Sequence, residues 1–334
     1  MGKYIVYFDS GTSNSRIYLL DQDFQVLYVD KKNVGSRNSS IEGSNRVLIE
    51  GLYELYTKLL QEKNLTEADV TDIYMSGMIT SPYGIKEVPH LKVPLSVREF
   101  ADSLYCHYED TLFHRNIYLV PGLKTVNDDF SFVGNMRGEE IEIIGTLDEL
   151  RSRGITHAAL MMPGSHTHVT YVKDDVVSDI ISNFTGELFY ALKKETIMAP
   201  ILGVEATADD LDPDMIHKAL ENLDRLGFNR SLYICHAMRI MESGTLLQRF
   251  SYGEGVVNGG VRKSLEYYCE HFWKGCDTLV IVSDEFMYRL FSIIFEGSPY
   301  IKNIVWMPIS ATKSYAVQGL RKIVGLKGEE KENE

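Results

Sequence analysis

The sequence predicts an α/β protein of two domains, each with a mixed sheet flanked by helices. Its 334 residues are 44% hydrophobic and 24% charged, which is enough length and apolar content for two cores. Its amino-terminal part shows three strand patterns followed by alternating helical and strand patterns, and this order starts again after Gly154. We therefore expect a first domain over residues 1–154 and a second over 155–334.

The composition excludes several classes of partner. The chain has 34 Lys and Arg against 47 Asp and Glu, a formal net charge of -13, whereas nucleic acid binding needs a basic excess. The four cysteines lack metal-type CxxC spacing, and no apolar run approaches the roughly 20 residues of a membrane span. The first residues lead directly into a strand pattern, without a cleavable leader. We expect a reduced, cytoplasmic protein that binds small molecules, and neither nucleic acid nor membrane.

The first domain begins with a β-meander. Residues 3–8, 15–21 and 25–32 are rich in β-branched and aromatic residues and are separated by hairpin distances, which predicts three antiparallel strands. Beyond them, apolar residues at helical spacing alternate with short apolar runs that end in glycine or Pro-Gly. These patterns predict helices over 45–63, 96–113 and 136–154, and strands over 70–78 and 116–123.

The second domain repeats the opening arrangement. The run over 156–182 reads as strand, glycine turn, strand, tight turn and strand. We interpret the two halves as structural duplicates. The elements expected after this run are helices over 184–194, 213–227 and 261–272, and a strand over 277–286.

Several conspicuous residues are expected to be structural. Tyr105, Tyr108 and Phe113 form an aromatic stripe on the 96–113 helix that is typical of packing against a sheet, so we expect them in the core. Cys235 lies in a segment of mixed character over 231–244, where a buried thiol is expected rather than a nucleophile. The histidines considered as zinc ligands lack partners at a supporting spacing, and no zinc site is expected at His157, His166, His168 or His236.

One short stretch interrupts the first hairpin with small polar residues. "FDSGTSNSR" (8–16) places an acid before a Gly-Thr-Ser-Asn turn and an arginine after it. Gly11 lets backbone N–H groups approach an anion, Asp9 can hold magnesium or water, and Arg16 offers a planar fork to charged oxygen. A plain hairpin turn with a surface arginine is the alternative. A second turn, "MPGSHTHV" (162–169), stands at the equivalent place in the second half and favours a phosphate site.

In this order, the motifs resemble the actin, heat-shock ATPase and sugar kinase superfamily, and in particular its 2-dehydro-3-deoxygalactonokinases. The resemblance implies two ribonuclease H-like domains with a nucleotide cleft between them. It also implies transfer of the γ-phosphoryl group of ATP, with Mg2+, to a hydroxyl of 2-dehydro-3-deoxy-D-galactonate, giving the 6-phosphate. A homodimer is compatible with it. The segments that carry the resemblance are "FDSGTSNSR", "SGMITSPYGIKEVP" (76–89), "VPGL" (120–123), "MRGEE" (136–140), "PGSH" (163–166) and "FTGELFYAL" (184–192).

The resemblance also implies a role for each matching residue. Asp9 would be catalytic and would hold the metal. The residues implied for phosphate binding are Gly11, Thr12, Ser13, Asn14, Arg16, Gly164, Ser165 and His166. Those implied for the sugar acid are Gly77, Met78, Tyr83 and Glu87, and those for adenosine are Gly259, Gly260 and Ser283.

Arg137 and Glu139, in "MRGEE", are the further catalytic candidates. Arg16 and Arg137 suit the carboxylate of an acid substrate, because a guanidinium can bind it through two parallel hydrogen bonds. Arg137 could equally pair with Glu139 or Glu140 on the surface of a helix. Glu139 and Glu140 are candidates for the general base or for accepting hydrogen bonds from sugar hydroxyls, although acids in a first helical turn also favour the positive end of the helix. The motif match favours a functional role for Glu139.

The chain departs from the family pattern just before "MRGEE" and just after the second turn. Gly134 and Asn135 replace an Asp-Val pair before "MRGEE", so the most natural general base is absent, with Asp128 or Asp129 as substitutes. His168 replaces a lysine after the second turn, which removes a fixed positive charge. These departures motivate a second hypothesis, a catalytically weakened family member that senses a sugar acid or a nucleotide. A nucleotide hydrolase is the third.

Overall fold

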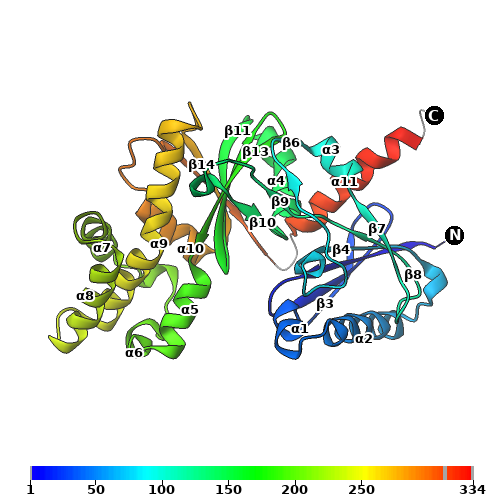
Figure 1. Cartoon of the computed structure of the whole chain (residues 1–334), viewed down its shortest axis with the longest axis horizontal. Coiled ribbons are helices and arrows are strands. Elements are labelled where there is room, and N and C mark those ends of the chain that lie inside the picture. The colour runs from blue at the N-terminus through cyan, green and yellow to red at the C-terminus, as the bar shows by residue number, and fades with distance from the viewer. Residues whose placement is uncertain (1, 311–313, 332–334) are drawn as a thin grey trace. The chain divides into compact units, whose positions relative to one another are not determined.

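The computed structural model describes residues 2–310 and 314–331, which form two compact units (Figure 1). Of the described residues, the first unit comprises 2–156, 174–178 and 314–331, and the second comprises 157–173 and 179–310. The first change of unit lies close to the boundary expected at Gly154. The C-terminal segment, however, belongs to the first unit, whereas we expected it in the second.

The first unit is built on a six-stranded sheet in the order β3-β2-β1-β4-β8-β7. The β1-β2-β3 meander is antiparallel, as predicted, and β4 pairs in parallel with both β1 and β8. Because β1 and β4 are parallel, their carboxyl ends lie at the same edge of the sheet. The strands are β1 (Tyr4–Ser10), β2 (Ser15–Leu20), β3 (Val26–Lys32), β4 (Val70–Gly77), β7 (Tyr105–Glu109) and β8 (Arg115–Leu119).

Helix α2 (Arg46–Lys63) packs on this sheet. Its apolar residues recur at helical spacing, and Leu48, Leu52 and Leu59 are fully buried in the same cluster as Phe8 of β1. The remaining shorter elements include α1 (Ser36–Glu42), α3 (Val97–Asp102), β5 (Leu91–Lys92), β6 (Leu95–Ser96), β9 (Leu123–Lys124) and β10 (Asn135–Met136). The sequence patterns did not indicate α1.

Helices α4 (Glu139–Ser152) and α11 (Tyr315–Lys331) also belong to the first unit and cross each other closely. A Cβ atom at Gly145 would collide with the carbonyl oxygen of Tyr315, and one at Gly319 would collide with the carbonyl oxygen of Ile141. Two glycines therefore let the two helix backbones touch. This packing explains why the C-terminal helix is part of the first unit.

The helix expected over 96–113 is wrong beyond Asp102, where α3 ends. The chain continues as strand β7, which pairs with β8 at the edge of the sheet. Tyr105 and Tyr108 lie on this strand and are 41% and 57% exposed, so the core assignment is correct only for Phe113. Aromatic residues three apart suit a helix, but tyrosine also favours strands, and pairing with β8 decides between the two.

The sheet of the second unit repeats the arrangement of the first, as predicted. Strand β11 pairs antiparallel with β12 and parallel with β14, just as β1 pairs with β2 and β4. Residues 176 and 177 of β13 belong to the first unit and pair with β6. Across the sheet, the strands lie in the order β15-β14-β11-β12-β13. Their bounds along the chain are β11 (His157–Pro163), β12 (His166–Lys173), β13 (Val176–Phe184), β14 (Thr278–Ser283) and β15 (Asn303–Pro308).

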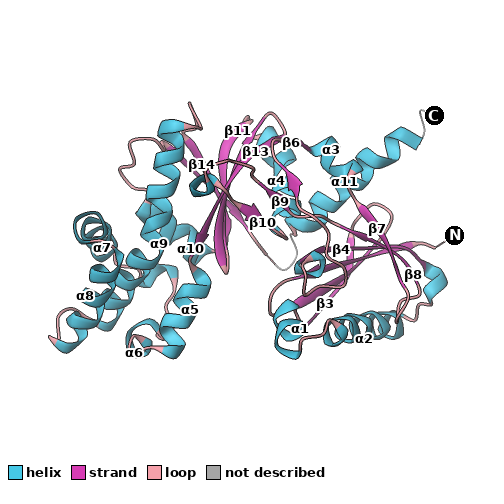
Figure 2. Cartoon of the chain, in the orientation of Figure 1, coloured by secondary structure: helices cyan, strands magenta, loops and turns pink. Residues whose placement is uncertain are grey.

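Most of the second unit outside this sheet is helical (Figure 2). The segment over 231–244 is mainly helix, and Cys235 on it is fully buried, as expected of a structural thiol. Helix α9 is much longer than the expected 261–272, because glycines such as Gly255 and Gly259 are contact positions against α7 rather than breaks. The helices are α5 (Gly186–Glu195), α6 (Ala199–Leu202), α7 (Pro213–Leu226), α8 (Phe228–Ile240), α9 (Leu246–His271) and α10 (Glu285–Ile294). Among the helices of the described segments, none combines the length and apolar character that crossing a membrane requires.

Candidate functional site

The turn between β1 and β2 is closed at its base and exposed at its tip. The Gly11 N–H donates to the carbonyl oxygen of Asn14 at 2.8 Å. Across the hairpin, the hydroxyl oxygens of Ser10 and Ser15 lie 2.8 Å apart. Residues 12–14 are exposed. The predicted hydroxyl and amide groups are therefore presented to solvent from a well-ordered base.

Helix α1 supports this turn from behind through Gly35, the residue that precedes its first turn. A Cβ atom at Gly35 would lie 2.5 Å from the carbonyl oxygens of Gly11 and Thr12. The backbone N–H groups of Ser36 and Arg37 donate to these same two oxygens, at 3.3 and 2.9 Å. The carbonyl oxygens of Gly11 and Thr12 are therefore satisfied by backbone groups at the start of α1.

Asp9 lies at the carboxyl end of β1, in register with Arg16 on β2 and Ser76 on β4. Arg16 Nη1 lies 3.4 Å from Asp9 Oδ2, and the Arg16 side chain is 56% exposed. Burial raises the pKa of Asp9, while the positive charge of Arg16 acts in the opposite direction. Asp9 is thus a partly buried acid beside the exposed turn, with an arginine that still has donors available to solvent.

The first turns of α4 add carboxyl groups near Asp9. Burial, with a contribution from the charge of Asp9, raises the pKa of Glu139 to about 7 and that of Glu142 to about 8. Glu140 is fully buried, accepts a hydrogen bond from the Gly138 N–H at 2.6 Å, and has its pKa raised by burial. Sequence reasoning missed Glu142, although its spacing of three residues from Glu139 places both on one face of a helix.

Two glycines bring α4 and β4 together beside these acids. Gly77, the last residue of β4, has a φ of 86°, and a Cβ atom there would collide with the carbonyl oxygen of Ser10. Gly138, just before α4, has a φ of 118°, and a Cβ atom there would lie 3.4 Å from the Cα atom of Gly77. Gly77, predicted to line the sugar-acid site, therefore lies where β1, β4 and α4 meet.

Arg137 connects the two ends of the loop over 80–90. Its Nη1 atom donates to the carbonyl oxygen of Thr80 at 2.7 Å and also to the Thr80 hydroxyl. Its Nη2 atom donates to the carbonyl oxygen of Val88 at 3.1 Å and lies 3.1 Å from His90 Nδ1. The guanidinium thus engages neutral oxygen and nitrogen atoms of the loop.

The other residues expected around the sugar acid lie on or next to this loop. Met78 begins a short 3-10 helix over 78–80, Tyr83 is 50% exposed, and Glu87 is exposed. A Cβ atom at Gly122 would lie 2.6 Å from the carbonyl oxygen of Met136 and 2.7 Å from the His90 ring. The segments around residues 80–90, 120–123 and 136–140 are therefore in contact.

The substitutes considered for the general base lie on a separate loop. Asp128 and Asp129 are exposed, and the Asp129 carboxylate accepts a hydrogen bond from the Ser131 N–H at 2.9 Å. This bond lowers the pKa of Asp129. A carboxyl group with a lowered pKa is a weaker base than Glu139, so the electrostatics favour Glu139.

The turn between β11 and β12 has the same support from behind as the first turn. A Cβ atom at Gly186, the first residue of α5, would collide with the carbonyl oxygen of Gly164. The Glu187 N–H donates to the carbonyl oxygen of Ser165 at 2.8 Å, and a Glu187 carboxylate oxygen lies 3.6 Å from His166 Nε2. Gly164 and Ser165 are exposed. The predicted residues thus form an accessible turn held by α5.

His168, which stands in place of the family lysine, turns inward from this hairpin. It is 7% exposed, and its Nδ1 atom lies 3.1 Å from the Ser182 hydroxyl. Burial lowers its pKa to about 4. The ring is therefore neutral at pH 7 and adds no positive charge to the turn.

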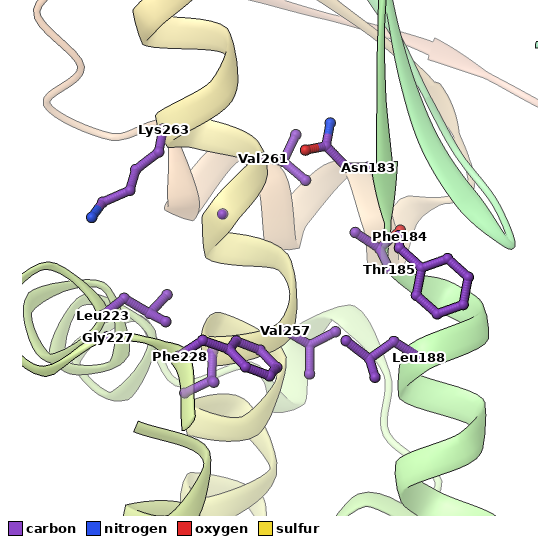
Figure 3. A pocket seen from close by; sticks show the side chains of 12 residues that line it. Asn183, Phe184, Thr185, Leu188, Leu223, Gly227, Phe228, Val257, Val261 and Lys263 are labelled. Atoms are coloured by element: carbon purple, nitrogen blue, oxygen red, sulfur yellow. The ribbon is translucent and has the colours of Figure 1, made fainter. Parts of the chain in front are cut away.

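A cavity of about 400 Å³ lies in the second unit. Figure 3 shows the side chains that line it. The Phe184 ring on its wall is 5.1 Å from the His166 ring, measured between centroids. Of the three residues expected around adenosine, only Gly260 lines this cavity, and a Cβ atom there would have no neighbour within 4 Å. Gly259 packs on α7 instead, and Ser283 is buried at the end of β14. The lining residues are Asn183, Phe184, Thr185, Leu188, Leu223, Gly227, Phe228, Val256, Val257, Gly260, Val261 and Lys263.

Asp9 has the chemistry expected of a magnesium ligand. Within the described residues, no group of three or more His, Cys, Asp or Glu side chains is arranged to hold a metal ion. Mg2+ that accompanies a nucleotide needs only one or two carboxylates, because phosphates and water supply its other ligands. A divalent cation beside Asp9 would also relieve the repulsion that helps to raise the pKa values of Glu139 and Glu142. These residues therefore fit such a metal.

Sequence comparisons point to one family. A family model described as 2-keto-3-deoxy-galactonokinase matches residues 9–305. A protein of Rhizobium meliloti (strain 1021) that is named as a 2-dehydro-3-deoxygalactonokinase is 26% identical over 196 residues. This match covers 59% of the chain and 58% of the relative, so it spans less than two thirds of the length of that relative.

Structural comparisons give the fold. A solved structure named as a 2-dehydro-3-deoxygalactonokinase protein from Sinorhizobium meliloti is 18% identical, with a TM-score of 0.75 over 98% of this chain and 99% of that one. Acetate kinase from Porphyromonas gingivalis is 9% identical, with a TM-score of 0.50 over 98% and 100%. The fold is thus of the two-domain, ribonuclease H-like type that the resemblance implies. Because the family match spans most of the sequence, the chain belongs to the 2-keto-3-deoxy-galactonokinase family.

Proposed function

We propose that this protein is an ATP-dependent kinase of 2-dehydro-3-deoxy-D-galactonate that yields the 6-phosphate. Family membership and the names of the relatives support this reaction. The structural observation that carries the proposal is the group of carboxyl groups at one edge of the first sheet, formed by Asp9, Glu139 and Glu142. Raised pKa values beside an exposed turn of small polar residues are typical of a site for proton and phosphoryl transfer.

In this proposal, Glu139 is the general base. Its pKa of about 7 leaves a large share of the side chain ionised at neutral pH while keeping it basic enough to take a proton. Glu139 accepts the proton of the 6-hydroxyl as the hydroxyl oxygen bonds to the γ-phosphorus. The bond from this phosphorus to the β–γ bridging oxygen breaks, and ADP leaves. Asp9 is the residue that would hold Mg2+, which supplies charge neutralisation when bound.

The two turns and the cavity provide the binding groups. We assign residues 11–14 to the phosphoryl group that is transferred and residues 164–166 to the other phosphates, because both turns expose small residues on a supported backbone. The purine is assigned to the cavity that Gly260 lines. The sugar acid is assigned to the site formed by Gly77, Met78, Tyr83 and Glu87, with the exposed donors of Arg16 for its carboxylate.

The proposal extends to the setting of the enzyme. Mg2+ is the metal, the cytoplasm is the location, and small molecules are the partners. A homodimer is the assembly to test first, by analytical ultracentrifugation. These points are supported by the acidic composition and by the kinase family rather than by a particular contact.

A coupled assay for ADP release tests the reaction. Purified protein with ATP, Mg2+ and 2-dehydro-3-deoxy-D-galactonate is expected to release ADP and to form a phosphomonoester that 31P NMR detects. If the protein phosphorylated only a different keto-deoxy acid, the proposed substrate would be wrong, but the assignment as a kinase would stand. ADP release that no sugar acid accelerates would indicate a nucleotide hydrolase. Ligand binding in calorimetry without ADP release would indicate a sensor.

A further inference from the structure

We infer that Arg137 is a positioning residue, which fixes the loop over 80–90 and leaves the carboxylate of the sugar acid to another cation. The inference rests on the proposed function, because it takes this loop as part of the sugar-acid site. It also changes the role that the resemblance implies for Arg137, since a residue that acts through a loop does not touch the reacting atoms.

The contacts of Arg137 use both terminal nitrogen atoms of the guanidinium. Nη1 donates to two oxygen atoms of Thr80, where the loop begins. Nη2 donates to Val88 and reaches the His90 ring, where the loop ends. An arginine grips a carboxylate through a pair of N–H groups that point the same way. Because these groups already connect the loop ends, Arg137 could bind substrate in this way only by releasing the loop.

His90 is a suitable acceptor for Arg137 because its ring is neutral. Burial and the positive charge of Arg137 lower the pKa of His90 to about 4, so one ring nitrogen keeps its lone pair at neutral pH. The ring also packs against Gly122, where a Cβ atom would lie 2.7 Å from His90 Cδ2. Arg137 is therefore anchored to a side chain that is itself held in place.

The same contacts connect Arg137 to the end of β4, the strand that pairs with β1 beside Asp9. The Val88 N–H donates to the carbonyl oxygen of Thr80 at 3.0 Å, which closes the loop at its base. The Thr80 hydroxyl donates to the carbonyl oxygen of Gly77 at 3.1 Å. Gly77 ends β4 at the edge where Asp9 lies. Removing Arg137 is therefore expected to loosen the loop and the end of β4 together.

Arg115 offers a matched control within the same unit. Its Nη2 atom donates to the carbonyl oxygens of Val70 and Thr71, at 3.0 and 2.8 Å. These residues begin β4, whereas the loop follows the other end of the strand. Arg115→Ala and Arg137→Ala each remove an arginine that bridges backbone carbonyls, but only Arg137→Ala is expected to free the loop.

Kinetics with a neutral analogue separate positioning from carboxylate binding. Arg137→Ala is expected to raise KM for the sugar acid about tenfold, with KM for ATP unchanged, and Arg115→Ala to change neither. The carboxamide of the sugar acid, used as a competitive inhibitor, is expected to lose affinity by the same factor as the acid. A preference for acid over carboxamide that disappears in Arg137→Ala would show that Arg137 binds the carboxylate, and would overturn the inference.

Proteolysis tests the loop without any enzymatic activity. Lys86 lies on the loop and is exposed, so cleavage after it by endoproteinase Lys-C, followed by mass spectrometry, measures how often the loop opens. Arg137→Ala is expected to be cut there about tenfold faster than the parent protein, and Arg115→Ala at the parent rate. Equal rates in all three would overturn the inference even in an active kinase. The parent protein could also prove to have no kinase activity. Faster cleavage of Arg137→Ala would then still support the role of Arg137 in the loop, and only the proposed function would be rejected.

A conservative variant guards against a general folding defect. Arg137→Lys keeps the charge, but a single ammonium group cannot connect Thr80 with Val88 and His90. We expect it to resemble Arg137→Ala in both assays while keeping the thermal midpoint of the parent protein. Full rescue of KM and of the cleavage rate by lysine would show that charge alone is needed, which contradicts a bridging role.

Discussion

The two hairpin turns share their support and differ in the groups around them. A glycine at the start of a helix presses on each turn, Gly35 on Gly11 and Gly186 on Gly164. Two residues before the turn glycine, however, the first hairpin has Asp9, whereas the second has the buried Met162. The backbone support is therefore common to both halves of the molecule, while the acid occurs in one. Under the proposed function, both turns bind phosphate, and metal and proton chemistry take place at the first alone.

The largest expected effect comes from removing the acid that distinguishes the first hairpin. Asp9→Asn is expected to lower kcat about a thousandfold, because the amide holds a divalent cation poorly. Met162→Leu, at the equivalent position of the second hairpin, is expected to leave kcat unchanged, since it replaces one apolar side chain by another of similar volume. The coupled ADP-release assay measures both. Full activity of Asp9→Asn would remove the chemical difference between the two turns.

The next largest effect concerns the acids that accompany the first turn. A general base must be ionised, and the pKa of Glu139 is raised to about 7, so kcat/KM is expected to fall as the pH drops through 7. Glu139→Gln is expected to lower kcat about a hundredfold and to remove this pH dependence. Rates between pH 5.5 and 9 with saturating ATP measure the profile. An unchanged profile in Glu139→Gln would assign the base to another group.

Stability measurements test the contact that each turn makes with a glycine at the start of a helix. Gly35→Ala and Gly186→Ala each place a methyl group against backbone carbonyls, which cannot move aside as a side chain can. Both are expected to lower the free energy of unfolding by about 1–3 kcal/mol, as seen in urea denaturation. Gly325→Ala on α11 is the control. A Cβ atom built there has no neighbour within 4 Å outside the adjacent helix backbone. Alanine is therefore expected to stabilise the helix by about 0.5–1 kcal/mol. Loss of stability in only one of the two variants would show that the supports are not equivalent.

The smallest expected effect lies in the cavity of the second unit that Gly260 lines. Gly260 is inside α9, and alanine there is expected to stabilise the helix by about 0.5–1 kcal/mol. The added methyl group points into the space assigned to the purine, so KM for ATP is expected to rise about threefold to tenfold, with KM for the sugar acid unchanged. Thermal melts and initial rates measure these changes. A stabilised variant with the parent KM for ATP would place the purine elsewhere.

Local patterns were sufficient to predict the hairpins and the helices over 45–63 and 136–154. Alternating apolar residues and turn residues are short-range signals, so the meander over 3–32 and its repeat over 156–182 could be read directly. The contact between the segments around 80–90, 120–123 and 136–140 could be expected only from the resemblance, because no short-range pattern brings them together. Glu142 could have been found, since it lies one turn beyond Glu139 on the same helix.

Contacts between distant parts of the chain explain what sequence reasoning missed. Gly35 and Gly186 support their turns from helices that follow a third strand, and a glycine far from its contact gives no local signal. The strand at 105–109 was read as helix because pairing with β8, rather than its own spacing, determines its conformation. For Arg137, the sequence suggested either substrate or a neighbouring acid, and the loop ends that it contacts are some 50 residues away.

The crossing of α4 and α11 has a consequence for how the protein is made. Leu320 and Ile323 of α11 are fully buried, so the first unit needs α11 to complete its core. During synthesis from the amino terminus, residues 157–310 emerge before that helix does. The second unit can therefore acquire its fold first, and the unit that is translated first is finished last. A stop codon placed before α11 would thus damage the unit that is built mainly from residues 2–156.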